Sequence, residues 1–142
     1  MDDTPRGKRY SSETIDVYFD PRTCIHAAEC VRGLPAVFVP TARPWITTAN
    51  ATAGELVSVI ERCPTGALHY VRKDGGTEER PDGTTSIRTI ARGPLYVRGE
   101  VELRNFDGTL VRRDTRVALC RCGASKNKPF CDNSHRVVDF EG

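Results

Sequence analysis

Three of the six cysteines and one of the three histidines lie within one short stretch, from Cys120 to His135. Cys120 and Cys122 are one residue apart, so in an extended segment both thiolates leave the same face of the chain. Cys131 and His135 are four positions apart, which is the spacing of one helical turn. Three thiolates and one imidazole suit a single zinc ion or an iron-sulfur cluster. The spacing alone does not decide between these two.

The order of residues in this stretch, CRCGASKNKPFCDNSH, resembles the motif of the CDGSH iron-sulfur family, the mitoNEET-like proteins. The positions that match are Cys120, Cys122, Ser125, Pro129, Cys131, Asp132, Ser134 and His135. The one departure is Asn133, where the family has glycine. Asparagine tolerates a positive φ better than other residues with a side chain, so the departure puts little in doubt. The resemblance implies a [2Fe-2S] cluster with Cys120 and Cys122 on one iron and Cys131 and His135 on the other.

The other three cysteines form a second set, and their order also resembles a known family. A Cys-Pro pair preceded far upstream by two cysteines is how a single-cluster ferredoxin presents its ligands. Residues 14–71 resemble the divergent single-cluster ferredoxin domain, which carries a [4Fe-4S] or [3Fe-4S] cluster. The resemblance implies that the ligands are Cys24, Cys30 and Cys63.

This second set is incomplete for a four-cysteine ferredoxin, which would have another cysteine where this chain has Ala27. Three thiolates suit a [3Fe-4S] cluster, and a fourth iron would need His26, water or an outside ligand. A loop histidine without a metal is the favoured interpretation of His26. By spacing alone, the three cysteines could also be buried thiols or zinc ligands.

Hydrophobic patterning predicts the elements that position these residues. Order is expected to begin at residue 15, where alternation over 15–19 predicts a half-buried strand. Thr52 and Glu55 form a capping box that begins a helix, and Cys63 lies at its end before Pro64 stops it. Residues 67–71 predict a second strand. Farther on, 95–98, 101–104, 110–111 and 117–119 predict short antiparallel strands separated by Gly-Pro, Gly-Glu and Asp-Gly turns. The last of them leads into Cys120.

These elements predict an α+β fold in two parts. We expect a flexible N-terminus at 1–12, a small ferredoxin-like domain at 13–72, a linker at 73–86, and a small antiparallel β-rich CDGSH-type domain at 87–142. The second domain is too small to bury much core, so a bound cluster is expected to supply part of its folding energy.

Composition excludes several classes of function. A formal net charge of +2 with 28% charged residues gives no large field, which argues against nucleic-acid binding. No apolar run is long enough to cross a bilayer, and residues 1–12 lack the apolar core of a signal peptide. We therefore expect a cytoplasmic protein without a membrane partner. In a reducing compartment, six cysteines are metal ligands more often than disulfides.

The predicted function is one-electron transfer. A cluster whose four ligands are all side chains has no open position for a substrate, and the chain has no catalytic set, so we expect no enzymatic activity. The expected partners are a reductase and an electron acceptor, or apo-proteins that accept a cluster, and the chain is expected to be a monomer or a homodimer. Histidine ligation should raise the potential and make potential and cluster retention depend on pH. The alternatives are a cluster donor, a redox or pH sensor, and a zinc-bound interaction module.

Overall fold

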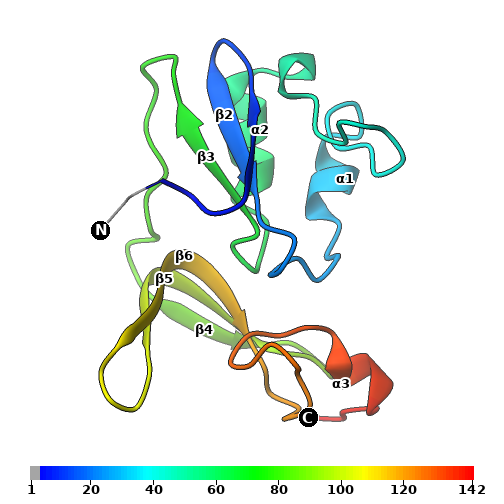
Figure 1. Ribbon diagram of the computed structural model, residues 1–142, viewed down its shortest axis with the longest axis vertical. Helices are drawn as coiled ribbons and strands as arrows, with labels where there is room; N and C mark the ends of the chain where they lie inside the picture. Colours follow the sequence, from blue (N-terminus) through cyan, green and yellow to red (C-terminus); the bar gives the residue numbers. More distant parts are fainter. Residues whose placement is uncertain (1–3) are drawn as a thin grey trace. The chain divides into compact units, whose positions relative to one another are not determined.

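The computed structural model describes residues 4–142, which divide into two compact units. The first unit takes residues up to Arg22, then 26–63 and 67–79. The second takes 23–25, 64–66 and 80–142. Each unit holds one three-stranded antiparallel sheet (Figure 1). The short segment that contains the predicted ligand Cys24, and the one that follows the predicted ligand Cys63, thus belong to the unit that holds the C-terminal motif.

The sheet of the first unit has the order β1-β2-β3, with β1 at Lys8–Ser11, β2 at Ile15–Phe19 and β3 at Leu68–Arg72. The strands predicted over 15–19 and 67–71 are confirmed, the second within one residue at each end. Order begins earlier than predicted, because β1 lies inside the stretch expected to be flexible. This strand is mostly exposed and is held by pairing with β2 rather than by burial. It therefore has no apolar alternation that a sequence could show.

Helix α2, at Ala53–Ile60, is the predicted helix, and its capping box is confirmed. Thr52 Oγ1 accepts from the Glu55 N–H at 3.1 Å, and a Glu55 carboxylate oxygen accepts from the Thr52 N–H at 3.1 Å. The predicted end is wrong, because the helix stops at Ile60 and Cys63 lies in the turn that follows. That turn is tighter than an α-helix, since the Cys63 N–H donates to the Ile60 carbonyl three residues back.

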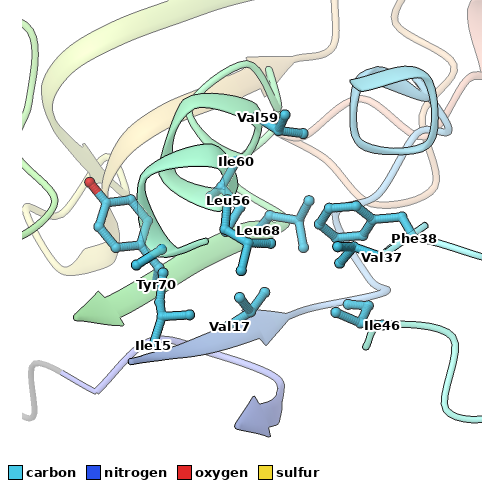
Figure 2. Close-up of a cluster of buried hydrophobic side chains, with 11 residues drawn as sticks. Ile15, Val17, Val37, Phe38, Ile46, Leu56, Val59, Ile60, Leu68 and Tyr70 are labelled. Atoms are coloured by element: carbon cyan, nitrogen blue, oxygen red, sulfur yellow. The ribbon is translucent and has the colours of Figure 1, made fainter. Parts of the chain in front are cut away.

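The core of the first unit lies between α2 and its sheet (Figure 2). Leu56 and Ile60 of α2 are fully buried, as are Ile15 and Val17 of β2. Near the end of β2 the ring of Phe19 meets Trp45 edge to face, with centroids 4.9 Å apart. The apolar face of α2 therefore positions the turn that carries a predicted ligand.

Two short elements of the first unit were not predicted: α1 at Glu29–Gly33 and the 3-10 turn η1 at Thr48–Asn50. Helix α1 has no buried residue, so it has no apolar stripe to detect. It can approach α2 closely because Gly33 has no side chain. A Cβ there would lie 2.8 Å from a Val59 methyl carbon.

The sheet of the second unit has the order β4-β5-β6, with β4 at Ser86–Thr89, β5 at Leu95–Arg104 and β6 at Leu110–Leu119. The four short strands predicted over 95–119 are two long ones. The predicted Gly-Glu turn is wrong, because Gly99, at φ 141°, lies at an irregularity where the pairing shifts between Arg98 and Val101. The Asp107-Gly108 turn is confirmed, with Gly108 at φ 87°.

Helix α3, at Ser134–Val137, is the last element of the second unit. A small core of Val97, Val117 and Phe130 lies between the sheet and the loop before α3. Among residues 4–142, no helix is long and apolar enough to span a membrane. The described part of the chain thus consists of two three-stranded antiparallel sheets with a few short helices.

Candidate metal centres

The end of β6 positions the first pair of predicted ligands. Cys120 follows β6 directly, and its N–H donates to the Pro129 carbonyl at 2.8 Å. The Cys131 N–H donates to the Ala118 carbonyl of β6 at 2.9 Å, so the returning loop pairs with the strand end. The Sγ atoms of Cys120 and Cys122 lie 3.9 Å apart. Strand pairing therefore brings Cys131 beside the two-cysteine motif, although it lies eleven positions beyond Cys120.

The start of α3 positions the second pair. Asn133 precedes the helix in the left-handed region, at φ 73° and ψ 7°, which confirms the prediction of a positive φ there. Because of this turn, His135 faces back towards Cys131, and its Nδ1 lies 3.5 Å from Cys131 Sγ. The two ligands predicted to share one iron are therefore neighbours.

Two motif residues that are not ligands hold the loop in shape. The Asp132 carboxylate accepts from the Lys126 N–H at 2.8 Å and from the Ser134 N–H at 3.0 Å. Hydrogen bonds from Ser134 and Lys126 lower the pKa of Asp132 to about 2. Ser125 Oγ donates to the Phe130 carbonyl at 2.6 Å and is buried. The polar motif positions therefore tie the loop between the two cysteine segments to the start of α3.

The thiols differ in how readily they ionise. Burial raises the pKa of Cys131, which is 4% exposed, even though the Asn133 N–H donates to its sulfur at 3.4 Å. Burial also acts to raise the pKa of Cys120, but the backbone N–H groups of Ser125 and Gly123 outweigh it, so that pKa is lowered. A metal ligand must be a thiolate. In the metal-free protein the raised pKa favours the protonated Cys131 thiol, so metal binding there would release that proton.

The imidazole of His135 is suited to bind a metal in its neutral form. Burial and the neighbouring Arg136 charge lower its pKa. Neutral imidazole is the form that coordinates metals. The nitrogen placed to share a metal atom with Cys131 is Nδ1, because it faces Cys131 Sγ and Nε2 lies on the opposite side of the ring.

Each pair has the separation of two ligands on one tetrahedral metal atom. Bond lengths of about 2.3 Å to sulfur and 2.0–2.1 Å to nitrogen place two such ligands about 3.8 Å (S and S) or 3.6 Å (S and N) apart. The observed separations are 3.9 and 3.5 Å. No three His, Cys, Asp or Glu side chains among residues 4–142 gather as a site for a single metal ion. Each of the two pairs is therefore spaced to bind one metal atom.

The N-terminal cysteines are placed in three different local settings. Cys30 lies in α1 and Cys63 in the turn after α2, and both pack against the core of the first unit. Cys24 lies in the 23–25 segment of the second unit. The structure does not gather these three as a site for one metal ion. Their ligation remains a prediction, as does the role of His26, which is exposed at φ 58°.

Sequence reasoning missed a residue beside the C-terminal ligands. Ile25 is 6% exposed and packs against Ala118 and Cys131 within the second unit. Its carbonyl accepts a hydrogen bond from Asn133 Nδ2 at 2.9 Å. A contact across more than a hundred positions has no local pattern, so the sequence offered no signal for it.

Comparison with known proteins finds a family match for each half of the chain. Residues 10–73 match the family model described as a divergent 4Fe-4S mono-cluster. The chain is also 42% identical over 64 residues to the protein YjdI of Escherichia coli K12, covering 45% of this chain and 84% of YjdI, and equally similar to YjdI of strain O157:H7. The chain belongs to the divergent 4Fe-4S mono-cluster family. Residues 92–136 add a match to the iron-binding zinc finger of CDGSH type.

The mono-cluster match contains Cys24, Cys30 and Cys63, and the CDGSH match contains both C-terminal pairs. The two resemblances noted from the motifs are therefore confirmed. The protein combines a mono-cluster domain with a CDGSH domain, and both belong to families that bind iron-sulfur groups. YjdI is named as an uncharacterized protein, so its name adds nothing on activity.

Proposed function

We propose that this mono-cluster and CDGSH protein is a one-electron carrier with two iron-sulfur centres. The observation that carries the proposal is the pair of ligand pairs in the CDGSH domain, with separations of 3.9 Å for Cys120 and Cys122 and 3.5 Å for Cys131 and His135. These four residues would hold a [2Fe-2S] cluster, two on each iron.

The ligand set favours electron transfer over catalysis. A bound [2Fe-2S] group would supply a site that gains or loses one electron, and Cys120, Cys122, Cys131 and His135 would occupy all four of its protein-ligand positions. A substrate would find no open position, so we propose that the protein is not an enzyme. Replacing one thiolate by neutral imidazole removes a negative charge and raises the reduction potential. The lowered pKa of His135 supports the neutral form in this role.

The second centre is proposed from the N-terminal family and its motif. Cys24, Cys30 and Cys63 would hold a [3Fe-4S] cluster, or a [4Fe-4S] cluster with a fourth ligand from outside this set. The match over residues 10–73 supports a ferredoxin-like α+β domain here. We propose a reductase and an electron acceptor as partners, in the cytoplasm, with the chain a monomer or homodimer. None of the six cysteines forms a disulfide. This agrees with the proposal that they bind metal in a reducing compartment, where disulfides are rare.

Analysis of anaerobically purified protein tests the proposal. Iron, zinc and acid-labile sulfide would be measured with the absorption spectrum, followed by EPR before and after dithionite. We expect a brown protein with sulfide and two distinct EPR signals. Cys122→Ser should remove the signal of one centre and Cys30→Ser that of the other. A colourless, sulfide-free protein with stoichiometric zinc would show instead a zinc-bound interaction module.

A second candidate function is delivery of the [2Fe-2S] cluster to apo-proteins. The observation in its favour is that His135 lies on a four-residue helix, α3, which has no buried residue. A ligand on so small an element can leave the metal at little cost in packing. Mixing the loaded protein with an apo-ferredoxin separates the two functions, because a donor loses its visible absorption to the acceptor and an electron carrier retains it.

A further inference from the structure

The segment that carries Cys24 belongs to the same compact unit as the CDGSH ligands. Residues 23–25 are part of the second unit. Within it, the Ile25 side chain is buried against Ala118 and Cys131. Cys24 is therefore covalently joined to a residue that contacts a CDGSH ligand.

Asn133 makes the polar link between the two segments. Its Nδ2 donates to the Ile25 carbonyl at 2.9 Å, while its backbone N–H donates to Cys131 Sγ at 3.4 Å. A carbonyl oxygen can only accept, so this contact orients the amide with its nitrogen towards Ile25. Its Oδ1 is buried and accepts no hydrogen bond from the described residues. The amide is therefore held in place by the bond to Ile25.

The position of Asn133 explains how one residue can serve both segments. At φ 73° it turns the chain between Cys131 and His135, a task that glycine performs in the CDGSH motif. Glycine has no side chain and could not reach Ile25. The asparagine keeps the required backbone conformation and adds a donor.

We propose that Asn133 is a positioning residue that couples the two metal centres, by holding the Cys24 segment on the loop that carries Cys131 and His135. Loss of the group bound through Cys24 would loosen this loop and speed release of the [2Fe-2S] cluster. By linkage, loss of the C-terminal cluster would lower the affinity of the N-terminal centre by the same factor by which loss of the N-terminal centre lowers the affinity for the [2Fe-2S] cluster. This inference rests on the proposed function, because it takes Cys24 and Cys131 to be ligands.

The test is a double-mutant cycle of Cys24→Ser and Asn133→Gly. Each protein is incubated with an iron chelator, and aliquots taken over time are reduced with dithionite. The decay of the [2Fe-2S] EPR signal then gives the release rate. One neutral hydrogen bond between the segments corresponds to about a fivefold change in the release rate. We expect Cys24→Ser to speed release about fivefold in the wild-type background. In the Asn133→Gly background, which already releases faster, it should add nothing.

Two further variants keep the result interpretable. Asn133→Asp tolerates the same φ but cannot donate to Ile25, so it should also abolish the effect of Cys24→Ser; this excludes a simple effect of glycine flexibility. Asn105→Gly makes the same change in the exposed β5–β6 turn and should leave release at the wild-type rate. The inference is overturned if Cys24→Ser has equal effects in both backgrounds. Absence of sulfide from the wild-type protein would instead show that the proposed function itself is wrong.

Discussion

Replacing Asp132 by alanine should weaken the hold of the CDGSH loop on its cluster. The Asp132 carboxylate accepts from the backbone N–H groups of Lys126 and Ser134, at 2.8 and 3.0 Å. A hydrogen bond to a charged group contributes about 1.5–3 kcal/mol. Because this side chain is partly exposed, solvent screening reduces each bond, and we take about 2 kcal/mol for the two together. That free energy corresponds to about a thirtyfold faster release of the cluster.

Asp132→Asn separates the two bonds. Asparagine keeps one oxygen that can accept from Ser134, while its NH2 group faces the Lys126 N–H and cannot accept from it. We therefore expect about a fivefold faster release, between alanine and wild type. The assay is the decay of visible absorption in excess chelator at constant pH. Asp107→Ala is the matched control, because Asp107 also accepts a backbone N–H, that of Thr109 at 2.9 Å, but in the β5–β6 turn.

The release rates of Asp132→Ala and Asp107→Ala, each compared with wild type, test whether the Asp132 carboxylate holds the loop. If Asp132→Ala releases its cluster within twofold of wild type, the carboxylate does not hold the loop and the reasoning fails. If Asp107→Ala accelerates release as much as Asp132→Ala does, the effect is a general loss of stability in the second unit.

Three further outcomes follow from the ligand set, the capping box and one buried carboxylate. His135→Cys should lower the midpoint potential of the [2Fe-2S] centre in an EPR-monitored titration, because a thiolate carries a charge that neutral imidazole lacks; a potential at or above wild type would contradict His135 as a ligand. Thr52→Ala should lower the free energy of unfolding by about 1 kcal/mol in urea, and an unchanged midpoint would show that the cap contributes nothing. Burial acts to raise the pKa of Asp16, but hydrogen bonds from Ser11 and Lys73 outweigh it and hold the pKa below the ordinary 3.8. Its stabilising contribution is therefore present above pH 3.8 and lost as the pH falls through the lower folded value, so Asp16→Asn should be less stable at pH 6 and show a weaker loss between pH 4 and pH 2.

Local patterns predicted the elements that depend on local chemistry. The strand over 15–19, the cap at Thr52 and the Asp107-Gly108 turn follow from alternation, side-chain acceptors and a positive φ, which neighbouring residues specify. Prediction was wrong where pairing overrode a local signal. Gly99 looked like a turn, but β6 pairs with the residues on both sides of it, and the glycine is accommodated as an irregularity. Likewise β1 has a polar sequence and is a strand only because β2 provides its partner.

The sequence by itself determined what the C-terminal site contains: three cysteines and one histidine as candidate ligands, their order, and the positive φ at Asn133. These are properties of one short stretch, in which spacing limits where each side chain can go. Only the tertiary structure decided which segments meet. It paired the loop of Cys131 with the end of β6, and it brought Ile25 to Asn133 from more than a hundred positions away. Such contacts depend on chain closure and packing over long distances, which no local spacing encodes.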